Sequence, residues 1–220
     1  IAEYAIENRV FLPIEEVPPL MKQAVLSAED QNFYHHRGID LVAMTRAAVT
    51  NVFNYASGKR LVGGSGITQQ VAKNFSLSGE VSYERKIKEA ILAYRIEGAL
   101  PKDRILELYL NEIYLGAGAY GVSAAAMKYF GKTLDDLTVS EAAYLASLPK
   151  APSNYHPVRN HDVARARRNW VVGRMLEDGH IDKETADSAR NEPLLAPNLA
   201  TAGQSPAPWF AEQAVSYTHL

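Results

Sequence analysis

Residues 83–116 have the sequence YERKIKEAILAYRIEGALPKDRILELYLNEIYLG. Apolar side chains recur at helical spacing in both halves of this stretch, which predicts two helices rather than strands. Pro101 separates the halves, because proline ends one helix and presets the backbone angle at the start of the next. Related faces of the two predicted helices carry Ile87, Ile91, Tyr94 and Gly98, and then Ile105, Leu106, Tyr109, Leu110 and Ile113.

The same helical period continues on both sides of this stretch, with few alternating runs that would favour strands. Val10-Phe11-Leu12 is the best short extended candidate. Thr138 and Glu141 form a capping box that begins one helix, and Gly131 ends another. Further helices are expected over residues 19–29, from 41 onward, and over 67–75, 122–130, 141–148, 162–178 and 182–190. We therefore predict a mainly α-helical fold.

The composition is that of one globular domain followed by a short tail. The chain has 220 residues, of which 47% are hydrophobic, and this is enough to bury a sizeable core. After Asn191 the helical period stops, and prolines alternate with alanine, glycine and serine as in a linker. We predict a domain over residues 1–191 and a linker, or the truncated start of a following region, over 192–220.

Charge and cysteine content exclude several classes of function. The net charge of −2 provides no field for nucleic acid, so we expect no nucleic-acid partner. The chain has no cysteine, which excludes disulfides and thiolate metal sites. No apolar run is long enough to cross a bilayer. Because the sequence begins at Ile1, we expect a fragment, and a membrane anchor could lie upstream of it.

The first candidate site is the stretch EDQNFYHHRG at residues 29–38. Glu29 and Asp30 follow an apolar helix and precede two aromatic residues and two histidines. A carboxylate beside apolar rings loses solvation, so its pKa rises toward a value that suits proton transfer. The alternative is a helix C-terminus with solvated charges and a satisfied histidine.

The second candidate site is the stretch GGSGITQQVAKN at residues 63–74. Residues 55–66 are rich in glycine, serine and basic residues, which predicts a mobile loop. A helix follows, and its free N–H groups and positive dipole end suit an anion such as phosphate, with Lys73 within two turns. The stretch is not a Walker loop, because Gly-Lys-Ser/Thr is missing. The alternative is a flexible surface loop.

Charged and polar residues on the later helices form a third group of candidates. Arg85 and Glu89 share a helix face, and with Lys86 they could grip a phosphate or form a common exposed ion pair. Asn111 is a polar residue among apolar neighbours, and a buried amide must find partners. The arginine-rich stretch 159–174 is more typical of a solvated helix face than of a site for anionic headgroups.

Taken in order, these clusters resemble the family 51 peptidoglycan glycosyltransferases, the polymerase domains of class A penicillin-binding proteins and the monofunctional transglycosylases. Five motifs of that family are matched in order. They are Glu29-Asp30-x-x-Phe33-x-x-His36-x-Gly38, GGSGITQQ at 63–70 with Lys73-Asn74, Arg85-Lys86-x-x-Glu89, ILExYLNxxYLG at 105–116 and AAAxKYFGK at 124–132. Gly66 departs from the family, which usually has threonine there, so a hydroxyl is lost and the backbone gains freedom.

The resemblance implies a fold, an activity and a location. The fold would be a larger, lysozyme-like helical lobe with a smaller jaw lobe near residues 50–75, whose apolar surface rests in the outer leaflet of the membrane. Phe53, Tyr55, Leu61 and Val62 are candidates for that surface or for the core. The activity would be polymerisation of lipid II into β-1,4-linked glycan strands, with inversion and release of undecaprenyl pyrophosphate. The location would be the outer face of the bacterial cytoplasmic membrane, and a transpeptidase domain could be linked.

The resemblance also implies roles for individual residues. Glu29 would be the general base, and Glu89 would be a second essential carboxylate that orients cations or holds a divalent metal, Mg²⁺ or Mn²⁺, on the pyrophosphate. No organic cofactor is expected. The substrate-binding residues would be Asp30, Phe33, His36, Ser65, Thr68, Gln69, Gln70, Lys73, Asn74, Arg85, Lys86 and Asn111.

Two other classes of protein remain as alternatives. A lysozyme-like glycan hydrolase needs two carboxylates, but it has no pyrophosphate to neutralise, so the basic residues argue against it. A non-catalytic module that binds glycan or membrane explains the aromatic and arginine residues, but it leaves Glu29 and Glu89 without a task.

Overall fold

The computed structural model describes residues 11–57, 64–74 and 83–202, and within these ranges the chain is helical. The described part contains no strand, only an isolated antiparallel bridge between Tyr114 and Tyr120. The predicted mainly α fold is therefore confirmed. Val10 lies outside the described residues, and Phe11 and Leu12 form no strand. The elements are η1 (Ile14–Glu16), α1 (Pro19–Glu29), η2 (Phe33–His35), α2 (Leu41–Ala56), α3 (Ile67–Asn74), α4 (Tyr83–Ala99), α5 (Lys102–Glu112), α6 (Val122–Phe130), α7 (Val139–Ser147), α8 (His161–Glu177), α9 (Lys183–Asn191) and α10 (Pro197–Ala202).

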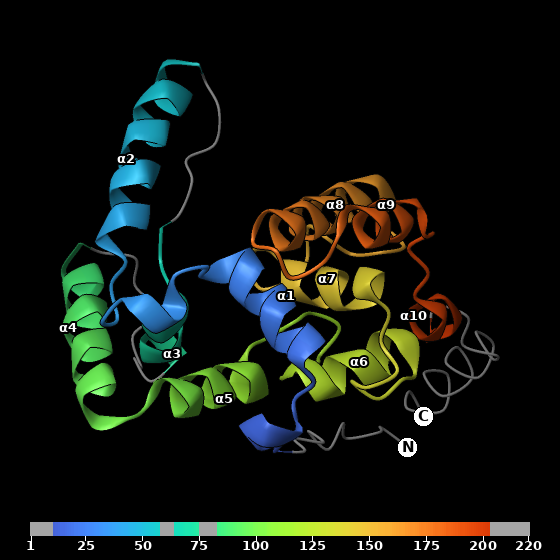
Figure 1. Ribbon diagram of the computed structural model, residues 1–220, viewed down its shortest axis with the longest axis horizontal. Helices are drawn as coiled ribbons and strands as arrows, with labels where there is room; N and C mark the ends of the chain where they lie inside the picture. Colours follow the sequence, from blue (N-terminus) through green and yellow to red (C-terminus); the bar gives the residue numbers. More distant parts are fainter. Residues whose placement is uncertain (1–10, 58–63, 75–82, 203–220) are drawn as a thin grey trace, which may run out of the picture.

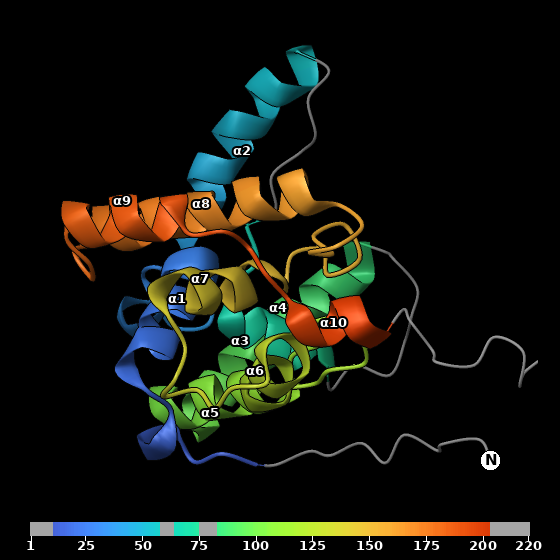
Figure 2. The same cartoon turned by 90° about the vertical axis from the view of Figure 1, so that its right-hand side faces the viewer.

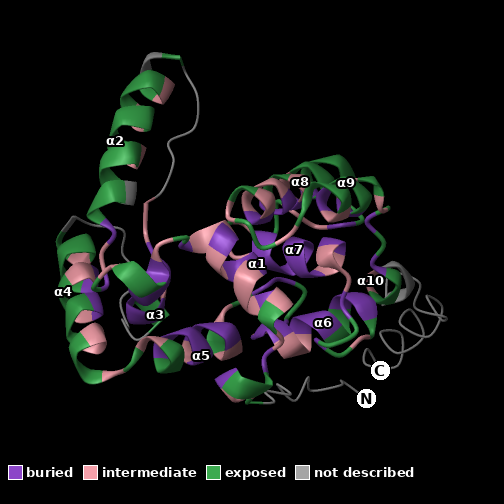
Figure 3. Ribbon diagram, in the orientation of Figure 1, coloured by how far each residue is buried: buried purple, intermediate pink, exposed green. Residues whose placement is uncertain are grey.

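The larger part of the molecule is a helical body built around α1 and α7 (Figure 1). Helix α7 packs against α1, α8 and α9, and α1 also packs against α8. Nearly every residue of α7 is buried, as the purple ribbon in Figure 3 shows. α1 contributes Met21, Ala24 and Val25 to the same core. Because α1 crosses this core, its last residue, Glu29, has a rigid support.

Local sequence signals set the ends of several helices where expected. Pro19 occupies the first turn of α1, and α6 ends at Gly131, which has a positive φ of 68°. The Thr138 side chain accepts from the Glu141 amide and the Glu141 carboxylate accepts from the Thr138 amide, which completes the predicted capping box.

Replacing Thr138 by alanine is expected to lower the free energy of unfolding by about 1–2 kcal/mol, because the first turn of α7 loses its cap. The Thr138 hydroxyl also donates to Glu192 Oε1 at 3.0 Å, and this contact would be lost too. Urea unfolding followed by circular dichroism measures the change. Thr50→Ala is the matched control, because its hydroxyl only bonds back to the Arg46 carbonyl within α2. An equal loss in both variants would contradict the prediction.

The smaller part consists of α2, α3 and α4. Helix α3 packs against α4 and α5, whereas α2 stands away from the rest of the molecule in both views (Figures 1 and 2). α2 exposes most of its apolar side chains, including Phe53 at 69% and Tyr55 at 84%. Leu61 and Val62 lie outside the described residues, as does half of the predicted loop, residues 58–63. The two apolar residues that the structure describes are therefore surface residues, not core.

The apolar face predicted for α4 is exposed to solvent. Ile87, Ile91 and Tyr94 are exposed, whereas Glu89 and Ala93 are buried. α4 contacts α3 and α5. Helical spacing therefore predicted the helix correctly, but not which of its sides is buried. No helix among the described residues is both long enough and apolar enough to cross a membrane.

The chain stays packed beyond the expected domain boundary at Asn191. Leu194 and Ala196 belong to the buried core, and α10 contacts α6. Asn198 Nδ2 donates to the Met127 carbonyl at 3.1 Å, beside the end of α6. The proline-rich stretch therefore begins as part of the helical body. Residues 203–220 lie outside the described ranges, and the linker assignment for them stays a prediction.

Candidate active site

Glu29 is the last residue of α1, and its carboxylate faces α3. Its Oε2 accepts a hydrogen bond from Gln70 Nε2 at 2.7 Å. Burial raises the pKa of Glu29, and the charge of Asp30 adds to this, whereas the Gln70 hydrogen bond, Arg167 and Lys150 act to lower it. A carboxylate with a raised pKa suits a general base, because its proton affinity is closer to that of the alcohol it must deprotonate.

Gln70 also lines a cavity of about 410 Å³, and its hydrogen bond connects Glu29 to that cavity, which Glu29 itself does not line. Lys73 and Asn74 line the same cavity and are exposed. Across it, the rings of Tyr114 and Tyr120 lie with their centroids 4.9 Å apart. The other lining residues are Glu112, Ile113, Pro149 and Pro152. An aromatic pair with nearby amide and charged groups is a suitable lining for a sugar, because rings offer an apolar face and amides offer hydrogen bonds.

A second cluster of predicted residues gathers on α4 and in the entry to α3. The Glu89 side chain is 1% exposed and lies 3.1 Å from Arg85 Nε and 2.9 Å from Lys86 Nζ. Lys86 Nζ also donates to Ser65 Oγ at 3.1 Å. The cluster therefore joins the glycine-rich segment to α4. With two cations and one carboxylate, the cluster carries a net positive charge. Because Glu89 is enclosed, its pairing differs from the common exposed ion pair that was the alternative interpretation of the sequence.

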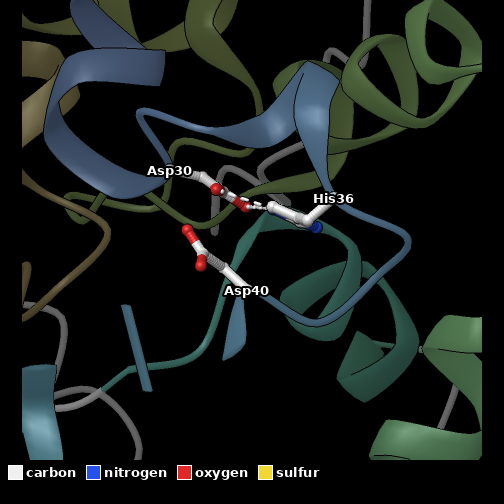
Figure 4. Close-up of side chains that lie close together, drawn as sticks. All are labelled: Asp30, His36 and Asp40. Carbon is white, nitrogen blue, oxygen red and sulfur yellow. Dashed lines mark hydrogen bonds and ion pairs between the residues drawn. The ribbon is translucent and has the colours of Figure 1, made fainter. Parts of the chain in front are cut away.

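Asp30 links the first and second sequence clusters. Its oxygens accept from the Ile67 amide at 2.9 Å and lie within hydrogen-bond distance of His36 Nε2, at 2.9 and 3.1 Å. Figure 4 shows the Asp30 carboxylate directed at the His36 ring, with the Asp40 carboxylate beside it. Asp30 is 6% exposed. These contacts place Asp30 and His36 in an internal network, and their substrate-binding roles stay predictions.

Four more predicted binding residues have contacts inside the protein. The Thr68 hydroxyl donates to Glu97 Oε1 at 2.6 Å, and Gln69 Oε1 accepts from the Gly66 amide at 3.1 Å. The Asn111 amide exchanges hydrogen bonds with the backbone of Leu12 at 2.8 and 2.9 Å, so it finds the partners that a buried amide requires. Phe33 is fully buried, and Lys102 Nζ lies 4.3 Å from its ring centroid.

Lys150 and Arg167 were not predicted to belong to the site. Both act on Glu29 electrostatically, because each lowers the pKa of its carboxyl. The Arg167 guanidinium lies 3.9 Å from the ring centroid of Trp170 and 6.0 Å from that of Tyr155. The sequence signal was present, since Arg167 lies in the arginine-rich stretch that we interpreted as a solvated face.

That interpretation is wrong for Arg168, which is fully buried. Its guanidinium donates to Ser140 Oγ, the Glu192 carbonyl and the Arg190 carbonyl, at 2.7, 2.7 and 3.0 Å. Runs of charged residues usually face solvent. Here Arg168 instead donates to carbonyl groups at the end of α9 and links that helix to α7.

The described residues contain a group of metal-ligand type, formed by Asp30, His36 and Asp40 with one ligand atom of each within 4.8 Å of the others. Asp30 already accepts from Ile67 and His36, and Asp40 Oδ2 accepts from Asn32 Nδ2 at 3.0 Å. An ion bound here would have to replace these internal hydrogen bonds, so the group also has a structural role without a metal.

Glu89, the predicted metal ligand, is enclosed with two cations. Both of its oxygens face cationic side chains, and the side chain is almost entirely enclosed. The predicted role of Glu89 in orienting cations is compatible with this geometry, and the predicted metal-ligand role stays a prediction.

Comparison with known proteins gives relatives for nearly the whole chain. Penicillin-binding proteins 1A from Rickettsia felis, Aquifex aeolicus and Escherichia coli are 49%, 51% and 49% identical to it over 96%, 86% and 96% of its length. The chain spans 27%, 26% and 25% of these relatives, about a quarter of their length.

A solved structure of another penicillin-binding protein 1A is also similar to this chain. The crystal structure of penicillin-binding protein 1A from Haemophilus influenzae matches with a TM-score of 0.51 and 30% sequence identity, over 86% of this chain and 18% of that one. The sequence model of the family described as transglycosylase matches residues 1–176. Because that model matches most of its length, and because relatives of about 50% identity cover nearly all of it, this chain belongs to the transglycosylase family, the family 51 peptidoglycan glycosyltransferases.

Proposed function

We propose that this chain polymerises lipid II, joining its disaccharide units through β-1,4 links and releasing undecaprenyl pyrophosphate. The observation that carries the proposal is the position of Gln70, which holds the Glu29 carboxylate at 2.7 Å and lines the cavity that Lys73 also lines. A base and a cation on two sides of one amide side chain match the two tasks of the reaction, which are to deprotonate an alcohol and to stabilise a departing diphosphate.

Glu29 is the proposed base for the 4-hydroxyl of the acceptor N-acetylglucosamine. Its raised pKa increases its proton affinity, while the Gln70 hydrogen bond holds the carboxylate in one orientation. The acceptor oxygen then attacks the donor sugar carbon on the face opposite the pyrophosphate, and the carbon–oxygen bond to the pyrophosphate breaks with inversion. The proton passes to Glu29, and the electron pair leaves on the diphosphate.

The leaving diphosphate is proposed to be stabilised by Lys73 and by the Arg85–Lys86–Glu89 cluster. Glu89 pairs with Arg85 and Lys86 at 3.1 and 2.9 Å, so it holds both cations in place without cancelling them. α3 packs on α4, which supports a shared role for Lys73 and this cluster. Fixed cations stabilise developing charge more than mobile ones, because they need no reorganisation during the reaction.

A divalent cation, Mg²⁺ or Mn²⁺, is proposed only as a companion of the substrate. Glu89 and the Asp30–His36–Asp40 group are both engaged in ion pairs or hydrogen bonds within the protein. Ions of this kind are often bound through substrate phosphates and water. No step described above passes through a metal, and no organic cofactor is required.

Contact with a membrane and linkage to a second domain are also proposed. The exposed apolar side chains of α2, such as Leu41, Val52 and Phe53, support contact with the outer leaflet of the bacterial cytoplasmic membrane, where lipid II and the growing chain are anchored. The relatives are about four times longer than the matched region, which supports a linked second domain such as a transpeptidase after the region 1–191 and its tail.

The direct test gives the purified domain lipid II in detergent and separates the products on a gel. A ladder of lipid-linked polymers supports the proposal. Short sugars without lipid would instead favour a lysozyme-like hydrolase. Binding of lipid II without any product would favour a non-catalytic glycan- or membrane-binding module, and either result would overturn the proposed function.

Replacing Lys73 by alanine is expected to lower kcat by about a hundredfold with a smaller change in KM, because its charge acts most on the diphosphate as it departs. Polymerisation rates over a range of lipid II concentrations separate the two constants. Lys183→Ala is the control, because Lys183 is an exposed residue at the start of α9. Unchanged kcat in Lys73→Ala would remove Lys73 from the reaction.

A further inference from the structure

We propose that Asp30 is the N-terminal cap of α3, supplied from the end of another helix, and that it fits there because residue 66 has no side chain. In this role Asp30 is a positioning residue, which sets the contact between Gln70 and Glu29. Its kinetic consequence rests on the proposed function, whereas the cap itself can be tested without any reaction.

The first turn of α3 requires an acceptor, because the first amide groups of a helix have no partner within it. Ile67 is the first residue of α3, and its amide donates to Asp30 Oδ2 at 2.9 Å. An N-cap side chain usually accepts from the second or third amide of the helix, but Gly66 has no side chain, and the acceptor in this first turn comes from Asp30. The negative charge of a carboxylate is also favourable at the positive end of the helix dipole.

Gly66 and Gln69 form the other half of a capping box. The Gly66 amide donates to Gln69 Oε1 at 3.1 Å, as the amide of an N-cap residue does to the side chain three positions later. The half that an N-cap side chain would form is absent, and Asp30 from the end of α1 instead accepts from the first amide of the helix, that of Ile67. Gln69 and Asp30 therefore provide acceptors for two successive amides at this helix start, those of Gly66 and Ile67.

The space beside Gly66 holds the Asp30 carboxylate and has no room for a side chain at position 66 as well. A Cβ atom added to Gly66 would lie 2.4 Å from Asp30 Oδ2 and 3.3 Å from Asp30 Cγ, and the first distance is well inside van der Waals contact. Asp30 has little freedom to move, because it is 6% exposed and is also held by His36. Any side chain at position 66 therefore displaces Asp30 from Ile67 or moves α3 away from α1.

The cap has a consequence for the candidate active site. Asp30 follows Glu29 directly, and Ile67 lies at the start of the helix that carries Gln70. Two hydrogen bonds, Asp30 to the Ile67 amide and Glu29 to Gln70, therefore join the same two helix ends. Loss of the first lets the first turn of α3 shift relative to the end of α1, although α3 stays packed on α4 and α5, and this shift separates Gln70 from Glu29.

The test combines variants at both positions. Asp30→Ala removes the acceptor, Asp30→Asn keeps an acceptor oxygen without the charge, and Gly66→Ala displaces the carboxylate. Gly98→Ala in α4 is the matched glycine control, because a Cβ there meets nothing within 4 Å. We expect amide hydrogen exchange in the first turn of α3 to become about tenfold faster in Asp30→Ala and Gly66→Ala, to change less in Asp30→Asn, and to stay unchanged in Gly98→Ala.

Turnover of lipid II is measured on the same variants. We expect kcat to fall about tenfold or more in Asp30→Ala and in Gly66→Ala with little change in KM, and to be partly retained in Asp30→Asn. The double variant Asp30→Ala, Gly66→Ala should lose little more than either single variant, because both remove one contact.

Additive losses in the double variant, or unaltered exchange in the first turn of α3, would overturn the proposal. Altered exchange with the expected non-additivity, in a chain that does not polymerise lipid II, would instead keep the cap and reject the proposed function. Circular dichroism of every variant, compared with Gly98→Ala, separates a local shift of α3 from general unfolding.

Discussion

Replacing Glu29 by glutamine is expected to lower kcat for lipid II polymerisation by about a hundred- to ten-thousand-fold, because the acceptor hydroxyl loses its base. Glutamine keeps the shape of the side chain and can still accept from Gln70 through its amide oxygen. Binding of lipid II should therefore persist while turnover is lost. Gel analysis of the products measures turnover, and retention of labelled lipid II measures binding.

The pH dependence provides a second readout of Glu29. The base acts only when it is ionised, so kcat should fall as the pH drops through the pKa of Glu29. Burial raises this pKa above its usual value near 4.5, so the fall begins at a higher pH than an exposed glutamate would give. The acidic limb of the pH–rate profile should disappear from the residual activity of Glu29→Gln.

Stability should change in the opposite direction from activity. A carboxyl whose folded pKa is raised favours the native state when it is protonated, and this contribution is lost as the pH rises through the folded pKa. At neutral pH the ionised, partly buried Glu29 therefore destabilises the fold, and Glu29→Gln should unfold at the same or a higher temperature. Glu15→Gln, at an exposed position, is the control for both readouts. Full activity in Glu29→Gln would reject Glu29 as the base.

Replacing Arg168 by leucine is expected to lower the free energy of unfolding by roughly 3–5 kcal/mol, the largest stability effect proposed for this chain. Arg168 is fully buried and donates to Ser140 Oγ and to the carbonyls of Arg190 and Glu192. Leucine fills part of the space but leaves these acceptors without donors. Urea unfolding, compared with the unaltered chain, measures the loss.

Two further variants show whether the hydrogen-bond geometry is the cause. Arg168→Lys keeps the charge, but its single ammonium group cannot span acceptors on two helices, so it should recover only part of the stability. Arg165→Leu, at an exposed position three residues earlier on α8, should change stability by about 0.5 kcal/mol or less. A loss in Arg168→Leu no greater than that in Arg165→Leu would contradict the structural role.

Short-range features of the structure were predictable from sequence. The capping box at Thr138, the stop at Gly131 and the pairing of Arg85 with Glu89 agree with the expectations. Each depends on residues within a few positions of one another, so the local chain carries the necessary information. The family was recognisable for the same reason, because its motifs are short and occur in a fixed order.

Contacts between distant segments were not predictable in this way. Helical spacing marked Ile87 and Ile91 as one face of α4 but could not show that this face is exposed. The arginine-rich stretch could not show that Arg168 is buried. The proline-rich texture after Asn191 concealed Leu194, which the core buries. Which side of a helix is covered depends on what packs against it, and that is a property of the whole fold.

By itself, the sequence determined the helical class, most helix ends, the family and the residue types available for the chemistry. Only the tertiary structure decided which of them meet, because Asp30 reaches Ile67 across 37 positions and Glu29 reaches Gln70 across 41. Hydrogen bonds over such separations form only after the fold has brought the end of α1 and the start of α3 together. The raised pKa of Glu29 arises in the same way, from burial that no local stretch of sequence contains.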